Sequence, residues 1–489
     1  MTVLHSTALA RSAALAPVLL ATLVACVVDA EDEVAVDRDS DSAPFSNETA
    51  VVSAAGGQQV TIRGRVFYND RRDHGLFAAR RTPTGAVGTR CNTAGQRDDG
   101  TACSLNWLGA QYAVVDVLDL DDGYGLLDVN CHPEVVLGSV AVNYDGSFAA
   151  TVSVDDACNH DDLGNAIALR VRLRYCGPWC FSLNTEEDAP YALYHPGASA
   201  ASPRIVAPGA DVSVGDMYFN PAGSPTTVAN NTSRAASYYA SLVDTILTVH
   251  RDAGVPFYKS SFGEIQYVYP SSLTATATAK SPTLVVISST LDPGWVGGKT
   301  SAHEYGHVLM QRAWDGDYGF DGVGISANDS TIAPSRQIAF KEAWAEFIAR
   351  AVFPLTYGCG LASFDDNATS PLPGALGQGA QWRLNVTKAL CDWYDGRNDD
   401  DAALAGAGDH FAADGIYSMW FNLRQMYLTA SLYGGDYAGE GLWFCDYVDY
   451  YLDVRQSTAA VGAASHANYV STITDLIYNN NIACFLPAP

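Results

Sequence analysis

Residues 303–307 read His-Glu-Tyr-Gly-His, which follows the pattern H-E-x-x-H. Residues four apart lie on the same face of an α-helix, so His303 and His307 can bind one metal ion together. Glu304 lies one position round the helix and can act on a water molecule that the metal binds. The segment 299–314 predicts such a helix, because hydroxyl side chains that can cap it are followed by an apolar run.

The metal needs a third protein ligand, with its fourth position left for water. A third histidine at the spacing H-E-x-x-H-x-x-G-x-x-H is excluded, because Val-Leu-Met-Gln-Arg-Ala follows His307. A second predicted helix opens at Pro334-Ser335 and places Glu342 and Glu346 on one face. One carboxylate can bind the metal while the other accepts a hydrogen bond from a ligand histidine. Two solvated acids are the alternative, but the chain has only 11 Glu, and three of them lie between positions 304 and 346.

This pair of motifs, H-E-x-x-H and a downstream helix with E-x-x-x-[DE], resembles the gluzincin metallopeptidases, the thermolysin-like group. The resemblance implies that His303, His307 and Glu342 bind Zn²⁺. It also implies that Glu304 is the general base and that Glu346 orients a ligand histidine. In such enzymes a β-sheet precedes the zinc helix, and its edge strand pairs with the substrate. We therefore expect a multi-domain chain that ends in an α+β zincin-type metallopeptidase domain with a helical C-terminal lobe.

Gluzincins also supply a His or Tyr from a later helix, which stabilises the oxyanion of the tetrahedral intermediate. The segment 408–420 reads G-D-H-F-A-A-D-G-I-Y-S-M-W and resembles their H-x-x-x-G-I stretch, with one additional residue before the Gly-Ile. The resemblance implies that His410 fills this role and that Asp409 orients it. Tyr417 is the alternative donor. A surface histidine in a loop is the competing interpretation of His410.

The expected activity follows from these residues. Zinc lowers the pKa of its bound water to about 7, and Glu304 would take the proton as this water attacks a peptide carbonyl. No G-A-M-E-N-like amine-anchoring motif precedes the zinc helix, so we expect an endopeptidase that acts on protein or peptide substrates. The alternatives are a surface adhesion or glycan-binding lipoprotein with a vestigial protease lobe, a zinc exopeptidase, and a glycoprotein-directed peptidase.

The start of the chain predicts where this chemistry takes place. A short apolar run ends at residues 23–26, Leu-Val-Ala-Cys, and resembles the bacterial lipobox. The resemblance implies that residues 1–25 are a lipoprotein signal peptide, that Cys26 is acylated, and that Val27 directs the protein to the outer membrane. An ordinary secretory signal is the alternative. Residues 26–58 are rich in Asp, Glu, Ser and Ala and predict a flexible acidic tether outside the cytoplasm.

The cysteine count agrees with an oxidising compartment. The chain has 11 cysteines, and removal of Cys26 leaves an even number suited to disulfide bonds. Six lie between Cys91 and Cys180, and four between Cys359 and Cys484. Each group is even on its own, which predicts two separately stapled domains, although the spacing leaves the connectivity open.

Residues 59–217 predict an all-β domain. Apolar side chains alternate with polar ones over 60–68 and over 167–175, where arginines occupy the polar positions. Asp145-Gly146 joins two further predicted strands and is a strong hairpin signal. Short strands with no helical stretch between them predict a disulfide-stapled β-sandwich. A spacer is the default role for it, and binding of substrate, glycan or cell wall is the alternative.

The remaining residues, 218–489, are expected to form the zinc peptidase domain. A Pro-, Gly-, Ser- and Thr-rich stretch at its start marks the boundary. Within the domain, 233–253 predicts a helix, and 264–269 and 283–288 predict strands.

The many acidic residues of the chain bear on its expected partners and bound ions. The formal net charge is −26, which excludes nucleic acid as a partner. The Asp-rich segments 119–123 and 395–401 supply the hard oxygen ligands that Ca²⁺ prefers. Neither follows the EF-hand spacing, and solvated turns are the alternative.

Overall fold

The structure is a computed structural model, and it describes residues 58–69, 107–119, 135–154, 165–186, 190–194, 204–206, 211–219, 231–272, 277–291, 295–316, 336–353, 358–359, 383–395, 415–432, 444–457, 482 and 484. The predicted signal peptide, the lipidation site Cys26, His410, Asp409 and most of both Asp-rich segments lie outside these residues. Within the part that the structure describes, no helix is long and apolar enough to cross a membrane.

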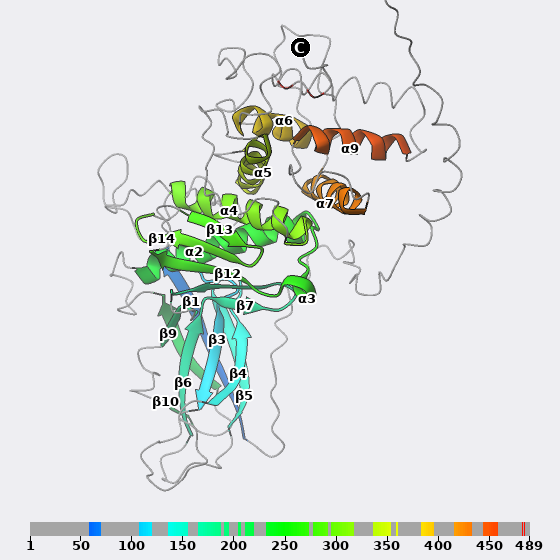
Figure 1. Cartoon of the computed structure of the whole chain (residues 1–489). Coiled ribbons are helices and arrows are strands. Elements are labelled where there is room, and N and C mark those ends of the chain that lie inside the picture. Colours follow the sequence, from blue (N-terminus) through cyan, green and yellow to red (C-terminus); the bar gives the residue numbers. More distant parts are fainter. Residues whose placement is uncertain are drawn as a thin grey trace, which may run out of the picture. The chain divides into compact units, whose positions relative to one another are not determined.

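The described strands of the N-terminal region form two β-sheets (Figure 1). These strands are β1 (Gln58–Asn69), β2 (Trp107–Gly109), β3 (Val114–Asp119), β4 (Val135–Ala141), β5 (Ser147–Val154), β6 (Asn165–Arg172), β9 (Ala192–Tyr194), β10 (Arg204–Val206) and β11 (Asp211–Tyr218). In the first sheet, β1 pairs in parallel with β11 and antiparallel with β2 and β5. In the second, the order β10-β6-β3-β4 is antiparallel throughout, and β9 also pairs with β6.

Strand β1 shows why the alternating sequence forms these sheets. Its side chains Val60, Ile62 and Val66 are fully buried. The arginines between them point to the opposite face, where Arg63 pairs with Asp211 and Arg65 with Asp216 on β11. The strands predicted over 60–68 and 167–175 are therefore present, although the second one divides.

Two local predictions differ from the structure. The turn at Asp145-Gly146 forms, because the Gly146 N–H donates to the Asn143 carbonyl at 3.0 Å. It does not close a hairpin: β4 pairs with β3, whereas β5 pairs with β1 in the other sheet. The segment 167–175 also leaves its sheet, since β6 ends at Arg172. Turn residues and alternating polarity are local features of the sequence. They do not determine which strand a given strand pairs with, because that depends on how the apolar faces of distant strands are buried.

A mixed sheet lies beside the helices of the C-terminal region, with the strand order β13-β14-β12-β8-β7. Its strands are β7 (Arg174–Cys176), β8 (Cys180–Asn184), β12 (Ile265–Ser271), β13 (Ala277–Ser281) and β14 (Leu284–Ser288). β12 is parallel to both β14 and β8, and the two edge strands are antiparallel to their neighbours. Because β7 and β8 precede residue 217, this sheet crosses the boundary predicted between 59–217 and 218–489.

The described helices include the three that the sequence predicted. The helices are α2 (Asn231–Ile246), a π-helical turn η1 (Leu247–Asp252), α3 (Lys259–Phe262), α4 (Trp295–Ala313), α5 (Arg336–Val352), α6 (Arg383–Asp395), α7 (Ile416–Leu432) and α9 (Phe444–Ser457). Helix α4 carries the H-E-x-x-H motif and packs between α2, β13, α5 and α7. The helix predicted at 299–314 and the one opening at Pro334-Ser335 are confirmed as α4 and α5.

Disulfide bonds tie local parts of the fold together. Cys176–Cys180 links β7 to β8, Cys359–Cys391 links the segment after α5 to α6, and Cys445–Cys484 joins α9 to the C-terminal segment. The four C-terminal cysteines pair among themselves, as their even number predicted.

Candidate metal centre

Helices α4 and α5 approach closely because small residues face each other at their contact. A Cβ added to Gly306 would lie 2.6 Å from the Ala345 Cα and 3.1 Å from its carbonyl oxygen. The glycine of the motif is therefore needed for this approach, which no larger side chain permits. The contact brings the histidines of α4 beside the glutamates of α5.

Replacing Gly306 with alanine should force α4 and α5 apart. Because the new Cβ would meet backbone atoms that cannot rotate away, we expect a loss of about 1–3 kcal/mol in the free energy of unfolding. Metal affinity should fall as well, since the three residues that could hold a metal ion, His303, His307 and Glu342, lie on both helices. Urea unfolding and metal titration measure these effects. Gly415→Ala is the control, because nothing lies within 4 Å of a Cβ added there; equal effects of the two substitutions would contradict the prediction.

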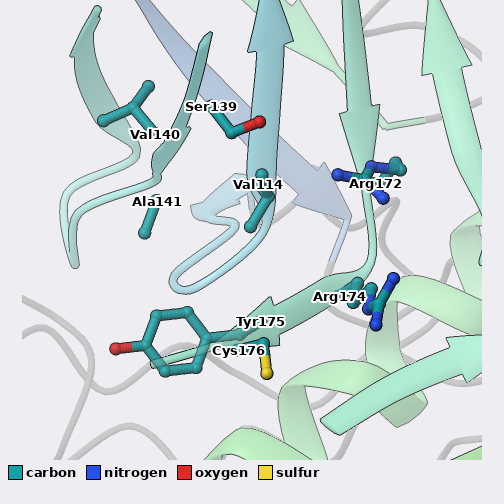
Figure 2. Close-up of a pocket in the computed structure, with 8 residues that line it drawn as sticks. All are labelled: Val114, Ser139, Val140, Ala141, Arg172, Arg174, Tyr175 and Cys176. Carbon is teal, nitrogen blue, oxygen red and sulfur yellow. The ribbon is translucent and has the colours of Figure 1, made fainter. Parts of the chain in front are cut away.

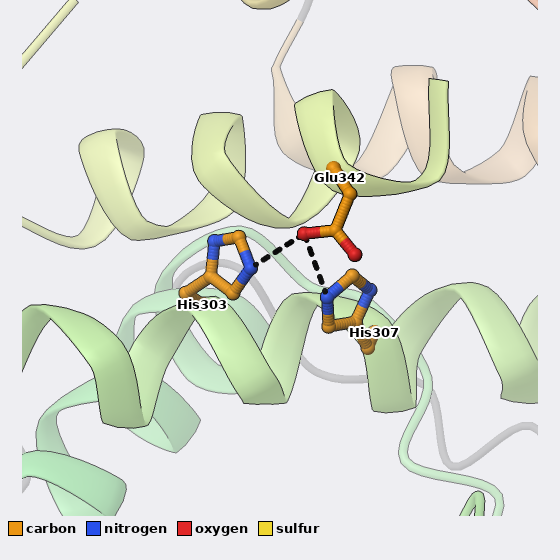
Figure 3. A group of neighbouring side chains, drawn as sticks. All are labelled: His303, His307 and Glu342. Atoms are coloured by element: carbon orange, nitrogen blue, oxygen red, sulfur yellow. Dashed lines mark ion pairs between the residues drawn. The ribbon is translucent and has the colours of Figure 1, made fainter. Parts of the chain in front are cut away.

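His303, His307 and Glu342 form a group that could hold a metal ion (Figure 3). One ligand atom from each lies within 4.8 Å of the other two. The Glu342 Oε2 is 3.3 Å from the His303 Nε2 and 3.6 Å from the His307 Nε2. All three side chains are largely buried, so the donor atoms converge in a partly desolvated place. Two imidazoles and a carboxylate suit a transition metal better than Ca²⁺ or Mg²⁺.

For Glu342 and His303, the direction of the pKa shift favours the protonation state that binds a metal. Burial by itself would raise the pKa of Glu342, but the charge of His307 and hydrogen bonds from both histidines hold that pKa well below its usual range. Burial lowers the pKa of His303, which favours the neutral ring. An ionised carboxylate and a neutral imidazole are both ready to donate electron pairs.

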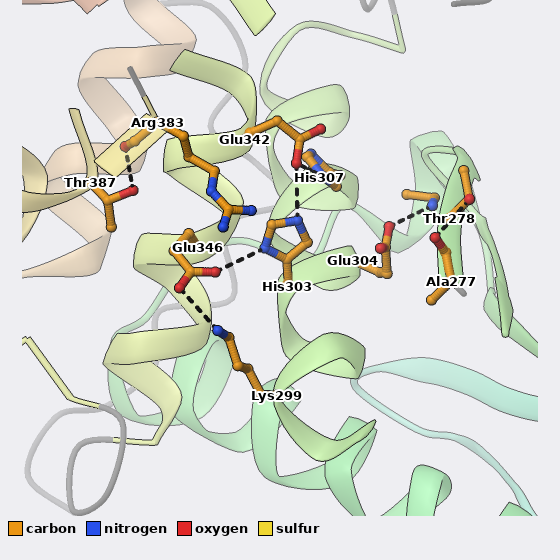
Figure 4. A network of polar contacts seen from close by, with 11 residues as sticks. Ala277, Thr278, Lys299, His303, Glu304, His307, Glu342, Glu346, Arg383 and Thr387 are labelled. Carbon is orange, nitrogen blue, oxygen red and sulfur yellow. Dashed lines mark hydrogen bonds and ion pairs between the residues drawn. The ribbon is translucent and has the colours of Figure 1, made fainter. Parts of the chain in front are cut away.

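Glu346 lies behind His303, as Figure 4 shows. Its Oε2 is 3.5 Å from the His303 Nδ1, and its Oε1 is 3.2 Å from both the Lys299 Nζ and the Arg350 Nη2. Burial raises the pKa of Glu346, and the positive charges of Arg350 and of Arg383 on α6 oppose that rise. The carboxylate of Glu346 thus lies between cations on one side and His303 on the other.

Glu304 faces the edge of the sheet on the other side of α4. Its Oε2 accepts a hydrogen bond of 2.7 Å from the Ala279 N–H on β13. Burial raises the pKa of Glu304, which brings it toward the range that suits a general base at neutral pH. β13 lies at one edge of its sheet and pairs with β14. The Ala279 N–H points to Glu304 and therefore lies on the side of β13 that faces away from β14.

Sequence reasoning missed several residues that support this site. β13 was not predicted, although alternating Thr and Ala at 274–279 was the available signal. His250 is 55 residues from Tyr305 in the sequence, but the structure places its Nε2 2.6 Å from the Tyr305 hydroxyl within the motif. The His250 Nδ1 is 2.6 Å from the Val255 carbonyl, which can only accept. The Nδ1 therefore carries the proton, and the Tyr305 hydroxyl donates to the Nε2.

The buried His250 predicts a loss of stability in acid. Burial lowers its pKa to about 3 from a usual value of 6.5. Below pH 6.5 the imidazole of His250 is protonated in the unfolded chain, whereas in the folded protein it stays neutral down to about pH 3. The free energy of unfolding that is present at neutral pH therefore decreases as the pH falls from 6.5 to 3. At pH 4.5 the cost is about 3 kcal/mol.

This effect can be isolated from the titration of carboxylates. Between pH 7 and pH 4.5, we expect the free energy of unfolding of the wild type to fall by about 3 kcal/mol more than that of His250→Gln. The variant has no imidazole at this position that could titrate. Urea unfolding at both pH values gives the measurement. A difference that stays constant with pH would show that His250 is not held neutral by burial.

The structure brings His303, Glu304, His307, Glu342 and Glu346 together. Tyr417 lies in the first turn of α7 and stacks on Phe421, with 6.1 Å between ring centroids. Both rings are exposed, so this conformation presents Tyr417 to solvent. Its role, and those of His410 and Asp409 outside the described residues, stay predictions, as does calcium binding.

Comparisons with known proteins add no assignment. No protein-family model matches the sequence, and no curated protein matches it. Among solved structures, a 9R-lipoxygenase from Cyanothece is similar at 13% sequence identity and a TM-score of 0.15, over 40% of this chain and 24% of that chain. At so low a TM-score the similarity carries no argument about fold or function.

Proposed function

We propose that this protein is a lipid-anchored, extracytoplasmic zinc metalloendopeptidase of the gluzincin type. The observation that carries the proposal is the convergence of His303, His307 and Glu342, with Glu304 on the same helix facing the edge strand β13. Two histidines and one glutamate are a ligand set of catalytic zinc sites, in which the fourth position holds water. Disulfide bonds support an oxidising compartment, and Cys26 would carry the anchor.

Several residues of the chain would have separate roles in peptide hydrolysis. His303, His307 and Glu342 would hold a zinc ion, which would supply an acidified water and a positive charge for the substrate carbonyl. Glu304 would take a proton from water as it attacks that carbonyl, on the oxygen that Ala279 does not hold, and would return the proton to the leaving amine. Glu346 keeps the His303 ring oriented through its Nδ1. The outer edge of β13 offers backbone groups to which an extended peptide can add as a further strand.

Metal analysis and peptide cleavage test the proposal together. We expect the purified chain to hold about one zinc ion and to cut internal bonds of a mixed peptide library. A chelator should abolish cleavage, and added zinc should restore it. Products trimmed only from one end would favour the exopeptidase alternative. A protein that holds zinc and cuts neither peptides nor glycoproteins would favour the adhesion or glycan-binding alternative and sink the peptidase proposal.

A further inference from the structure

A buried arginine near the C-terminal end of α4 has no role in the hydrolysis described above. Arg312 is 2% exposed. Burial lowers the pKa of its guanidinium to about 10, so the group is still charged at neutral pH. Among the described residues, no carboxylate pairs with it. A buried charge without a counter-ion is costly, and the contacts that Arg312 makes must offset this cost.

These contacts join α4 to two other segments of the chain. The Arg312 Nε donates to the Pro282 carbonyl at 2.8 Å, and its Nη1 donates to the Phe257 carbonyl at 2.6 Å. The guanidinium also lies over the rings of Phe257 and Phe262, 4.9 Å and 5.3 Å from their centroids. Hydrogen bonds from a charged donor and desolvated cation–π contacts are stronger than their neutral or exposed counterparts. Pro282 lies in the turn between β13 and β14, so Arg312 ties this turn to α4.

Helix α4 therefore holds the β13–β14 hairpin at two points. Glu304 accepts from the Ala279 N–H at 2.7 Å, and Arg312 donates to the Pro282 carbonyl. The positions from Glu304 to Arg312 span about 12 Å of helix, and those from Ala279 to Pro282 span about 10 Å of extended chain. The end of β13 thus runs alongside α4 between the two contacts. A single hydrogen bond would leave the hairpin free to rotate about it, whereas the second contact fixes the direction of β13.

We propose that Arg312 is a positioning residue, which fixes the direction of the edge strand β13 on α4 and thereby the path of an extended peptide past Glu304. This inference rests on the proposed peptidase function. It separates long substrates from short ones. A peptide that pairs along β13 depends on the direction of the strand, whereas a dipeptide blocked at both ends reaches little beyond the bond that is cut.

Kinetics with both kinds of substrate test the inference on Arg312→Lys, which keeps the charge but has no planar fork to serve two carbonyls at once. We expect the KM of a long peptide to rise about tenfold, the effect of losing one charge-assisted hydrogen bond. Its kcat, and both constants for the blocked dipeptide, should stay unchanged. Arg312→Ala removes both bonds and should raise that KM further; should it fail to fold, the lysine variant carries the test. Equal losses with the long and the short substrate would make Arg312 a merely structural residue and overturn the inference.

Arg172→Lys is the matched control. Arg172 also donates to a buried acceptor, Asp116, at 2.8 Å. It lines a cavity of about 340 Å³ in the β-region that no residue of α4 or β13 borders (Figure 2). We therefore expect Arg172→Lys to keep the wild-type KM for the long peptide, and a rise equal to that of Arg312→Lys would overturn the inference.

Hydrogen exchange gives a readout that needs no activity. Arg312→Lys should speed the exchange of the amides of 277–284 and leave those of β12 unchanged, because only the hairpin end loses its second contact. A wild type that cleaves neither substrate would overturn the proposed function and this inference together. A wild type that cleaves both, beside a variant with unchanged exchange and unchanged KM, would overturn this inference alone.

Discussion

Glu304→Gln is expected to lower kcat/KM for peptide hydrolysis by about 10²–10⁴-fold, the range that a positioned general base contributes. The amide keeps the size of the side chain, and its oxygen can still accept the hydrogen bond from the Ala279 N–H. It cannot take a proton from water. Bound zinc should stay at the wild-type level, because Glu304 is not one of the three residues that form the group able to hold a metal ion.

Activity and zinc content must be measured on the same preparation. Glu186→Gln provides the control, since Glu186 is an exposed glutamate that hydrogen-bonds to Ser272 far from α4 in sequence. We expect this variant to cleave as the wild type does. If Glu304→Gln cleaves as fast as the control while holding zinc, another group must activate the water and the assignment of Glu304 is wrong.

The parts of the site that could be predicted from the sequence are those set by helical geometry. The spacing of His303 and His307, and that of Glu342 and Glu346, determine a shared face as soon as each segment is helical. These four side chains come together once α4 and α5 pack against each other through their apolar sides. Gly306 within the motif then sets how closely they meet.

The parts that could not be predicted depend on contacts between distant segments. Tyr305 and His250 are 55 residues apart and meet through packing of η1 against α4. β13 is short and built of Ala, Thr, Lys and Ser, so the alternation at 274–279 is a weak signal by itself, and the pairing with β14 completes the strand. The arginines of 167–175 were identified only as the polar positions of a strand, and Arg170 and Arg172 pair with the buried Asp116. Alternation shows which residues share a face and does not show what that face contacts.

Glu342→Ala is expected to remove the metal itself, with more than about a hundredfold loss of zinc affinity, beyond the usual effect of changing a group behind the ligands. Glu342 Oε2 is the atom that both imidazoles face, at 3.3 Å and 3.6 Å, so alanine leaves two ligands where a protein zinc site needs three. Cleavage should be lost with the metal. Competition with a chromophoric chelator measures the affinity, and the melting temperature of the metal-free variant shows whether it still folds.

Glu346→Gln is the graded control for that experiment. Its amide can still accept from the His303 Nδ1 but no longer offsets the charges of Lys299 and Arg350, so we expect a loss of zinc affinity of about 10–100-fold. The order wild type, Glu346→Gln, Glu342→Ala would place Glu342 on the metal and Glu346 behind it. The reverse order would exchange the two roles, and full zinc occupancy in Glu342→Ala would mean that the third ligand is another residue.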